Sequence, residues 1–421
     1  MFLRGFSLVG DTIVGIDIGA SKVCTIIGRM DRANQIDIIG SGISPCNGVK
    51  KGIIVDIEAT ANSIKESINQ AESMSGVKVN SAYANIMGSH VNVVNNRAGI
   101  TISNENKEIT SRDVERVLNA VREIAVPDDR QIIDIIVKQY IIDDYDEIID
   151  PIGMVGVRLE VEADIVIAKI TSVQNIVKSF ERANLRINGL IIQALATSEV
   201  LLAQDEKEMG VLMIDVGAGV TDVSVFRKNN LIFYDSIPVG GDHITNDISI
   251  GLKVSFGEAE KIKKQYNLAL TSLIKNDQDI SINDTNRVNK KSIKVSEAVE
   301  IIEARVYEMF SLCKEMLQNA GIDMNLSAGT VLTGGGISRL DGCIQLAGEV
   351  FELPVRIAEN KVAGISKDEY VTSAGMIKYI FSNKKGLSAE AEVVAAMNRT
   401  PQKKKKNKLL EKLSKFFSDF F

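Results

Sequence analysis

Two short segments of the chain share residue types that suit phosphate and metal binding. IDIGASKV at 16–23 and IDVGAGVTDV at 214–223 each contain a strand-like run that reaches an aspartate and then a glycine-containing turn. Glycine allows backbone N–H groups to approach a phosphate closely, and a hydroxyl in the turn adds a donor. Asp17 and Asp215 are suited to hold a hydrated Mg²⁺ through water, because hard cations prefer oxygen ligands. Lys22 would add a positive charge near the β- and γ-phosphates of a nucleotide.

The motif occurs twice, and this repetition carries more information than either copy. One copy alone is typical of a plain turn, but two copies 198 positions apart indicate two related domains that face each other. A third glycine cluster, Gly334, Gly335 and Gly336 in VLTGGGISRLDG, also follows a strand-like run. Its backbone could pack against a flat adenosine, although a tight strand-to-helix turn is the alternative. The chain has neither the Gly-Lys dipeptide of a Walker A loop nor a GxGxxG dinucleotide fingerprint.

The composition excludes several classes of protein. The 421 residues, 45% hydrophobic and 25% charged, are typical of a globular chain with two to four domains. The four cysteines lie far apart without a CxxC pair, as expected in a reducing cytosol. Two histidines are too few for a histidine-rich metal site. The sequence contains no apolar run long enough for a transmembrane helix and no secretory signal. The net charge of −6 argues against general nucleic-acid binding.

The hydrophobic periodicity predicts an α/β chain with an insertion. Strand patterns around residues 12–45 precede an amphipathic helix, IEATANSIKESINQAESM, with Ile57, Ile64, Ile68 and Met74 roughly on one face. Residues from about 86 to 162 predict a small α+β unit of long strands and one helix. A second α/β domain begins near residue 196, and its polar stretch NDQDISINDTNRVNKKSIK predicts an exposed hairpin.

The end of the chain has the pattern of a membrane-binding helix. Residues 401–421 carry +5, from seven lysines and two acidic residues, so the remainder of the chain carries −11. A helix over LLEKLSKFFSDFF would be about 20 Å long, too short to span a bilayer but able to lie in its headgroup region. A terminal helix docked on the protein's own core is the alternative. The predicted membrane-binding residues are the apolar face and two lysines beside it: Leu409, Leu410, Leu413, Phe416, Phe417, Phe420, Phe421, Lys412 and Lys415.

These loops resemble those of the actin, Hsp70 and sugar-kinase superfamily, and within it the FtsA family of bacterial cell-division proteins. NGVKKGIIVDIEAT at 47–60 and PVGGDHITNDISIGLKVSFGEAEKIKKQY at 238–266 are further likenesses. The segments MGSHVNVVNNRAGITIS and EITSRDVERVL in the predicted insertion also resemble the family. The resemblance covers residues 12 to about 382 and then the last dozen.

The resemblance implies an α/β, actin-like, two-lobed ATPase fold with ATP and Mg²⁺ between the lobes. An inserted subdomain, 1C, would replace the usual subdomain 1B of actin. The boundaries we expect are 1–85 and 163–195 for subdomain 1A, 86–162 for 1C, 196–383 for the second lobe and the closing 1A helix (2A, with 2B at about 244–320), 384–408 for a flexible basic linker, and 409–421 for the amphipathic membrane-targeting helix.

The resemblance also assigns roles to individual residues. The predicted nucleotide-binding residues, beyond the triple glycine, are Asp17, Gly19, Ser21 and Lys22 in the first phosphate loop, Asp215, Gly217, Gly219 and Thr221 in the second, Gly240 and Gly241 in the next turn, and Glu260, Lys263 and Lys264 around the ribose and base. Without the resemblance, the last three are typical of a solvated helix face. Gln193 in LIIQALATS corresponds to the position that orients the attacking water. Since glutamine is a poor base, we expect slow ATP turnover at most, with the nucleotide serving mainly in assembly. His243 is more typical of a structural histidine in a turn.

The implied function is that of a peripheral membrane protein on the cytoplasmic face of the cell membrane at the division site. It would polymerise like actin, bind anionic lipids and the FtsZ tail peptide, and contact other division proteins through the insert, without binding nucleic acid. By the resemblance, Arg305 and Glu308 in IIEARVYEMF would contribute to FtsZ binding, although as bare sequence they are more typical of an ordinary exposed pair. The alternatives are a soluble sugar-kinase-type phosphotransferase, for which no catalytic aspartate can be assigned, and a PilM-like pilus-assembly scaffold without the tail.

Overall fold

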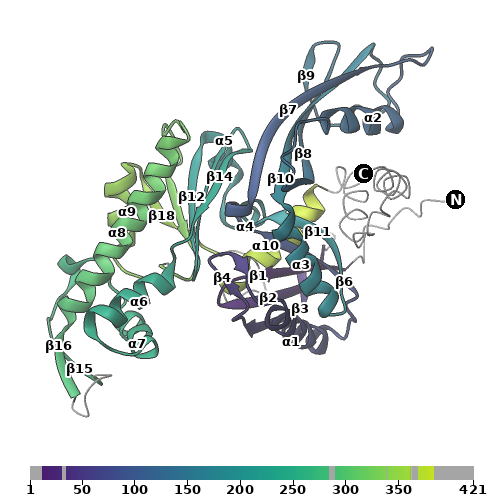
Figure 1. Ribbon diagram of the computed structural model, residues 1–421. Helices are drawn as coiled ribbons and strands as arrows, with labels where there is room; N and C mark the ends of the chain where they lie inside the picture. Colours follow the sequence, from purple (N-terminus) through teal and green to yellow (C-terminus); the bar gives the residue numbers. More distant parts are fainter. Residues whose placement is uncertain are drawn as a thin grey trace, which may run out of the picture.

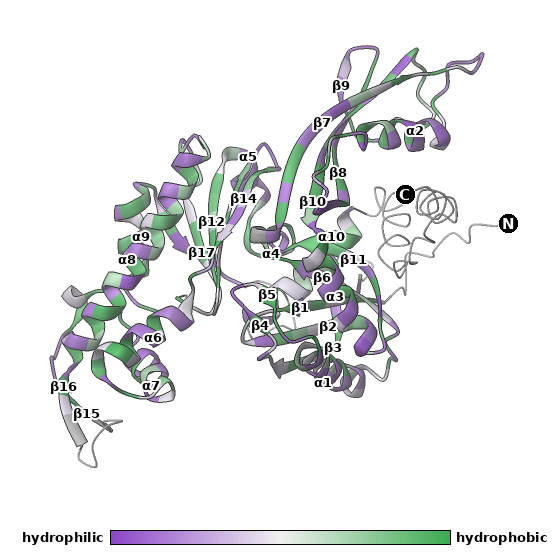
Figure 2. Cartoon of the chain, in the orientation of Figure 1, coloured by the Kyte–Doolittle hydropathy of each residue, from purple (hydrophilic) through white to green (hydrophobic). Residues whose placement is uncertain are grey.

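The chain folds into two α/β lobes and a sheet that projects from the first lobe as an arm (Figure 1). Each part has its own cluster of buried apolar side chains, and hydrophobic residues concentrate on the faces that pack together (Figure 2). Within the part of the chain described, no helix is both long and apolar enough to cross a bilayer. The computed structural model describes residues 12–30, 35–283, 290–337, 339–360, 362 and 368–383.

The first lobe is a five-stranded sheet in the order β11-β6-β1-β2-β3. The first three strands along the chain form an antiparallel meander, and the other two pair in parallel beside β1. The strands are β1 (Ile13–Ile18), β2 (Lys22–Met30), β3 (Ile36–Pro45), β6 (Ser81–Ile86) and β11 (Arg186–Ile192), with a small separate hairpin of β4 (Val49–Lys50) and β5 (Ile53–Ile54).

Helices cover the two faces of this sheet (Figure 1). The helices α1 and α3 pack together on one side, and α4 and α10 pack together on the other. Asp56 caps the start of α1 by accepting from Ala59 N at 2.9 Å, and Gly76, in the left-handed region, ends it. The helices are α1 (Ile57–Ser75), α3 (Ile170–Arg182), α4 (Gln193–Leu201) and α10 (Val371–Ser382), and η3 (Asp368–Tyr370) is a short 3₁₀ turn before α10.

The second lobe repeats the topology of the first. Its sheet has the order β14-β13-β12-β17-β18, again an antiparallel meander with two parallel strands added. The predicted internal duplication is therefore visible in the strand pairing. The strands are β12 (Val211–Val216), β13 (Thr221–Arg227), β14 (Asn230–Ile237), β17 (Thr330–Thr333) and β18 (Val355–Ile357).

One face of the second sheet joins the two lobes, and helices pack against the other. Met213, Phe226 and Val331 belong to the buried cluster of the first lobe, so the lobes share apolar contact. The predicted polar hairpin is present as β15 (Asp279–Asn283) and β16 (Lys290–Lys294). The helices of this lobe are α5 (Gln204–Met209), α6 (Gly241–Leu252), α7 (Phe256–Tyr266), η2 (Thr271–Leu273), α8 (Val295–Asn319) and α9 (Cys343–Phe351).

The arm is a four-stranded antiparallel sheet in the order β7-β10-β8-β9 with one helix, α2, packed against it. This is the small α+β unit that the sequence predicts between pieces of the first lobe. Thr110 and Asp113 form a capping box at the start of α2. Its elements are η1 (Gly88–His90), β7 (Val91–Thr101), α2 (Ser111–Val121), β8 (Arg130–Ile142), β9 (Tyr145–Ile148) and β10 (Arg158–Lys169).

One detail of the predicted helix α1 is wrong. Ile64 and Ile68 face the core as expected, but the side chain of Met74 is 64% exposed. Met74 lies in the last turn, just before the cap at Gly76, and its sulfur accepts a hydrogen bond from the hydroxyl of Ser41 in β3 at 3.7 Å. The side chain therefore contacts the sheet, but most of its surface stays exposed.

We predict that Gly375→Ala destabilises the protein, because α10 lies so close to α4 that a β-carbon at this position would overlap the carbonyl oxygen of Ala196. Overpacking of this kind costs about 1–3 kcal/mol. The matched control is Gly257→Ala in α7, where the added carbon meets nothing within 4 Å and should stabilise the helix by up to about 1 kcal/mol. Urea unfolding of both variants measures the difference, and equal stabilities would contradict this close packing.

Candidate nucleotide-binding site

The two predicted phosphate loops have the same local structure. Each aspartate lies one residue before the end of its strand, Asp17 in β1 and Asp215 in β12. The turns are closed by equivalent hydrogen bonds, from Gly19 N to Lys22 O and from Gly217 N to Val220 O, both 2.9 Å. The similarity of the two motifs in sequence therefore reflects a repeated strand-turn-strand unit.

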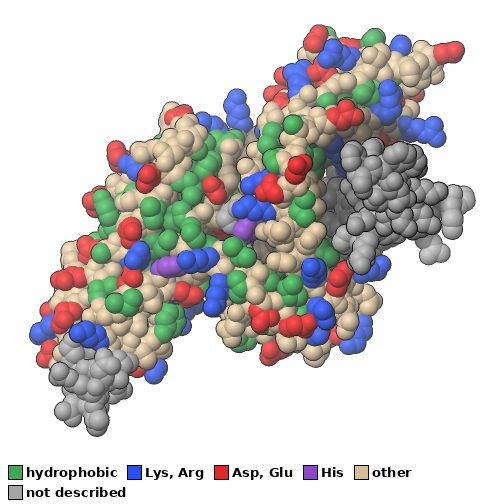
Figure 3. Space-filling view, in the orientation of Figure 1, with side chains coloured by type: hydrophobic (Ala, Val, Ile, Leu, Met, Phe, Trp, Pro, Cys, Tyr) green, Lys and Arg blue, Asp and Glu red, His purple; other side chains and the backbone are tan. Residues whose placement is uncertain are grey.

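The structure brings the loops of the two lobes together. A β-carbon placed on Gly219 would lie 3.2 Å from Cβ of Ala20 in the first loop. It would also lie 3.4 Å from the backbone nitrogen of Lys51, in the turn between β4 and β5. In the space-filling view, Lys and Arg side chains line the groove between the lobes (Figure 3). This is a place where a polyanion could contact both lobes.

The other predicted glycines lie beside the second loop. Gly241 N, at the start of α6, donates to Gly217 O at 2.9 Å, and Gly336 N donates to Val216 O at 2.8 Å. A β-carbon on Gly241 would come within 2.8 Å of Cα of Gly336, so the two backbone segments can approach this closely only because the residue is glycine. Around Gly335 a β-carbon would meet nothing within 4 Å. Gly335 thus presents open backbone beside the second loop, whereas Gly334 and Gly336 pack against it. The adenosine-binding role of the triple glycine stays a prediction.

A chain of hydrogen bonds crosses from one lobe to the other. The amide of Asn85 accepts from Ile18 N at 2.8 Å and donates to Oε1 of Gln193 at 3.0 Å. Gln193 in turn donates through Nε2 to Oδ2 of Asp215 at 3.2 Å. Gln193 therefore stands beside a predicted metal-binding carboxylate, with both ends of its amide engaged. The sequence did not single out Asn85, which is 108 positions away from its partner Gln193.

Three carboxyl groups gather where the lobes meet, and burial raises the pKa of each. The pKa of Asp17 rises to about 7, mainly through burial, with Lys22 opposing and Asp215 adding to the shift. The pKa of Asp215 is raised by burial, against the hydrogen bond from Gln193 and the charge of Lys22. Burial and the neighbouring charge of Asp215 raise the pKa of Asp222 to about 8. A bound cation would favour the ionised forms of these groups.

Asp222 is the functional candidate that sequence reasoning missed. It is 3% exposed and is paired in register with Asp215 across β12 and β13. Its Oδ1 accepts from Gly88 N at 3.3 Å and from the hydroxyl of Tyr234 at 3.4 Å, while its Oδ2 has no partner. Gly88 begins the arm, so Asp222 links the second lobe to the root of the insert. An aspartate in the otherwise uncharged segment VTDVSVF was the available signal.

Charged side chains of helix α7 pack against neighbouring residues of the site. On a solvated helix face they would extend into water instead. Lys263 is 7% exposed, and its ammonium donates to Gly241 O at 3.1 Å and to Thr245 Oγ1 at 2.7 Å. Glu260 forms ion pairs with Lys263 at 2.7 Å and with the exposed Lys264 at 3.1 Å. The alternative interpretation of Lys263 as a solvated side chain is therefore wrong. These residues fix α7 against the N-terminus of α6, beside Gly241.

The remaining predicted residues of the loops are also placed. The buried hydroxyl of Thr221 donates to Val239 O at 2.8 Å and supports the turn before Gly240. Ser21, at the tip of the first loop, is exposed, and its carbonyl oxygen accepts from Cys46 N. The ammonium of Lys22 lies 3.8 Å from the carboxylate of Glu369 in η3.

His243 has a structural role. Its Nδ1 accepts from Gly240 N at 3.1 Å, at the start of α6. This agrees with the interpretation of a histidine in a turn, since the ring caps a backbone donor that the helix leaves free.

Arg305 and Glu308 lie on α8, on the side of the second lobe away from the first lobe (Figure 1). The guanidinium of Arg305 pairs with Asp247 of α6 and, at 2.6 Å, with Glu308. The two predicted FtsZ-binding residues are therefore in contact with each other, on a different surface from the phosphate loops.

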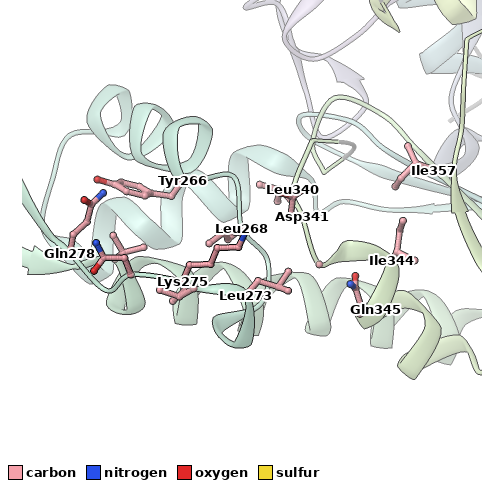
Figure 4. Close-up of a pocket in the computed structure, with 14 residues that line it drawn as sticks. Tyr266, Leu268, Leu273, Lys275, Gln278, Leu340, Asp341, Ile344, Gln345 and Ile357 are labelled. Atoms are coloured by element: carbon pink, nitrogen blue, oxygen red, sulfur yellow. The ribbon is translucent and has the colours of Figure 1, made fainter.

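A cavity of about 650 Å³ lies on the second lobe beside the segment that follows the triple glycine (Figure 4). Leu268, Leu340 and Ile344 line it, and Lys275 points into it. Asn267 and Ala269 hydrogen-bond to Asp341 along one side. None of the predicted nucleotide-binding residues lines this cavity, so it is distinct from the loops described above.

We predict that Asp222→Asn reduces the dependence of stability on pH. A carboxyl whose pKa is raised in the folded state stabilises fully below its unfolded pKa of 3.8, and this contribution is lost as pH rises through about 8. Between these values one such group lowers the free energy of unfolding by up to about 1.4 kcal/mol per pH unit. Urea unfolding at pH 6, 7 and 8 without Mg²⁺ or nucleotide should show a shallower slope for the variant. The exposed Asp128→Asn serves as control, and equal slopes for all three proteins would contradict the shift.

Comparison with known proteins agrees with this arrangement. The sequence model of the family described as "Cell division protein FtsA" matches residues 212–375, and that of the "SHS2 domain inserted in FTSA" matches residues 88–167, the arm. The model described as "Type IV pilus assembly protein PilM" matches residues 151–272. Among solved structures, MreB5 of Spiroplasma citri bound to ADP has a TM-score of 0.53 at 15% identity, covering 90% of this chain and 99% of its own. The PilM-PilN type IV pilus biogenesis complex gives 0.54 at 14% identity, with 92% and 99% covered.

These structures show that the fold is actin-like, with the insert as an added domain. Curated relatives are similar over most of their length. The cell division protein FtsA of Bacillus subtilis is 39% identical over 370 residues, covering 88% of this chain and 83% of the relative. That of Borreliella burgdorferi is 34% identical over 414 residues, covering 96% and 98%. That of Escherichia coli K12 is 31% identical over 393 residues, covering 90% and 92%. With this identity over nearly the whole chain, the protein belongs to the FtsA family of cell division proteins.

Proposed function

We propose that this chain is an ATP-binding, actin-like division protein that polymerises on the cytoplasmic face of the cell membrane and tethers FtsZ filaments of the division ring to it. One observation supports nucleotide binding above all: two equivalent glycine loops, one from each lobe, meet at Gly219 and Ala20. A ligand with several phosphates would contact both loops, so its binding would favour the closed arrangement of the lobes.

The carboxylates fit a magnesium ion held through water. Asp17 and Asp215 are half-buried at the ends of matching strands, and burial raises the pKa of each although the charge of Lys22 opposes the shift. Oxygen donors of this kind suit Mg²⁺, which keeps several waters when it binds phosphates. When bound, Mg²⁺ would neutralise phosphate charge. The chain itself would position the phosphates through Gly19, Gly217 and Lys22.

The surroundings of Gln193 support slow hydrolysis at most. Its amide is held between Asn85 and Asp215, so it can orient a water but cannot take a proton from it. Asp222 is a neighbouring carboxyl whose Oδ2 has no hydrogen-bond partner among the described residues, yet this oxygen is fully buried. The nucleotide would therefore act mainly as a ligand that sets the conformation of the two lobes.

The membrane part of the proposal rests on sequence, because residues 384–421 lie outside the described part of the chain. Each lysine near an anionic surface contributes about 1 kcal/mol, and the cluster before the predicted helix supplies five. The apolar face of the helix, with three leucines and four phenylalanines, adds burial in the headgroup region. A helix this short is marginal in water, so we expect it to fold on the membrane.

Two surfaces are available for protein partners. Arg305 and Glu308 offer opposite charges one turn apart, which would suit the mixed-charge tail peptide of FtsZ. The far end of the arm exposes several large apolar side chains, a pattern typical of an interaction surface for a further copy of the chain or another division protein. These residues are Tyr145, Ile149, Ile152, Met154, Val155 and Val157.

The two alternative functions lack support of this kind. A sugar kinase needs a carboxylate that reaches a substrate hydroxyl, and Asp222 is too deeply buried to do so. A PilM-like scaffold is favoured by one family match and by the fold. It would not require the amphipathic end of the chain, so membrane binding separates the two functions.

We predict that the full-length protein sediments with anionic vesicles and that a chain ending at Lys408 does not, because the truncated chain lacks the apolar face. Phe417→Glu should abolish sedimentation, whereas Ser418→Glu, with the same charge change on the polar face, should retain most of it. Sedimentation with and without Mg-ATP shows whether assembly contributes. If the truncated chain binds as well as the full-length protein, or if neither binds, the tail is not the anchor and the PilM-like function gains support.

We predict that Arg305→Glu weakens binding of an FtsZ tail peptide at least tenfold, since it replaces a charge-assisted contact worth about 1.5–3 kcal/mol by repulsion. Fluorescence anisotropy of a labelled peptide measures the affinity. Arg182→Glu is the control, because Arg182 also pairs with an acidic residue but lies on the first lobe. Melting temperatures identify any loss of folding. Unchanged affinity in a folded Arg305 variant would place the peptide elsewhere.

A further inference from the structure

The segment NGVKKGIIVDIEAT at 47–60 is not explained by the loops described so far. It forms the short hairpin of β4 and β5, with Lys51 and Gly52 as its two turn residues. Both have positive φ, 50° and 76°, which is the geometry of a type I′ turn. Lysine is an unusual residue for this conformation, because its side chain makes the left-handed region unfavourable. A charged residue is nevertheless placed at the tip.

The turn is held firmly against the first lobe. The carbonyl oxygen of Gly52 accepts a hydrogen bond from Nε2 of His90 at 3.1 Å. His90 is 7% exposed, and burial lowers its pKa, so the ring is neutral and Nε2 carries the donated proton. At the base of the hairpin, Gly48 O accepts from both Val55 N and Asp56 N. The tip of the turn therefore has a fixed position relative to the root of the arm.

That position is the point where the two phosphate loops meet. A β-carbon on Gly219 would lie 3.4 Å from the nitrogen and 3.8 Å from Cα of Lys51, with Ala20 of the first loop on its other side. The backbone of Lys51 thus touches the loop of the second lobe while it is attached to the first. A lysine side chain starting here can reach a phosphate held between the loops through its flexible four-carbon stem.

The charges around this point favour a second cation. Lys22 lies 3.8 Å from Glu369, which offsets part of its charge. Lys51 is exposed and, in the part of the chain that the structure describes, forms no ion pair. A triphosphate brings one more negative group than a diphosphate, and it would enter a site that already contains the carboxylates of Asp17 and Asp215. An additional ammonium would bind the terminal phosphate in particular.

We propose that Lys51 is a third phosphate-binding residue, whose ammonium binds the terminal phosphate of a nucleoside triphosphate and so distinguishes it from a diphosphate. This inference rests on the proposed binding of ATP. Because the same turn touches Gly219, the contact would be made when the lobes are closed on the nucleotide. Lys51 would then report the presence of the terminal phosphate to both lobes.

The test compares three variants of the full-length chain. Lys51→Gln removes the charge but keeps most of the side chain, and Lys51→Arg keeps the charge. Lys228→Gln is the matched control, because Lys228 also has a φ of 50° in a two-residue turn, between β13 and β14. Dissociation constants for Mg-ATP and Mg-ADP are measured by isothermal titration calorimetry.

We expect Lys51→Gln to weaken Mg-ATP binding about tenfold, the size of one charge-assisted hydrogen bond, and to change Mg-ADP binding less than twofold. Lys51→Arg and Lys228→Gln should stay near wild type for both nucleotides. If wild type binds and Lys51→Gln binds ATP equally well, or loses ATP and ADP to the same extent, the assignment to the terminal phosphate is overturned while ATP binding stands. If wild type binds neither nucleotide, the proposed function fails together with this inference.

Discussion

The arrangement of the molecule depends on the burial of three carboxyl groups where the lobes meet. Burial raises the pKa of Asp17, Asp215 and Asp222, and the charge of Lys22 opposes the shift at the first two. Such groups are costly unless neighbours satisfy them. The hydrogen bond from Gln193 partly satisfies Asp215, and it crosses from the first lobe to the second. In the proposed function, these buried carboxyl groups would suit a metal-bound polyanion, because a bound cation favours their ionised forms.

Two hydrogen bonds connect the root of the arm to the region where the lobes meet. Gly88 N donates to Asp222, and His90, two residues later, donates to Gly52 of the hairpin tip. A β-carbon on Gly88 would come within 2.8 Å of the backbone of Asp235, so the root also packs against β14 of the second lobe. Any change in the relative position of the lobes must therefore alter contacts at the base of the insert. The arm is joined to the nucleotide site mechanically, although its sheet lies outside the lobes.

The sequence predicted local features well and distant contacts poorly. The turns after Asp17 and Asp215 could be predicted because the residues that form them are adjacent, and the repeat of the motif anticipated the repeated sheet topology. The contacts of Asn85 with Ile18 and Gln193, and of Asp222 with Gly88, could not, since these partners are 67 to 134 positions away. Lys263 was ambiguous for the same reason: a charged helix position next to other charges looks solvated until α6 is placed beside it. Periodicity identifies a buried face, but only the packed structure identifies which polar residue is enclosed within it.

Weak membrane binding by one chain is an advantage if the chain assembles. In the proposed function, a short helix and a lysine cluster would bind reversibly, and the acidic remainder of the chain, at −11, would be repelled by anionic lipid while the tail, at +5, would be attracted. If several copies joined, their tails would act together and the overall affinity would exceed that of each tail by orders of magnitude. Nucleotide binding, by setting the closure of the lobes and with it the surfaces available for assembly, would then control membrane attachment without touching the membrane-binding segment. In this proposal the segment 384–408 would act as a linker that leaves the tail free to reach the membrane, instead of a tail helix docked on the core.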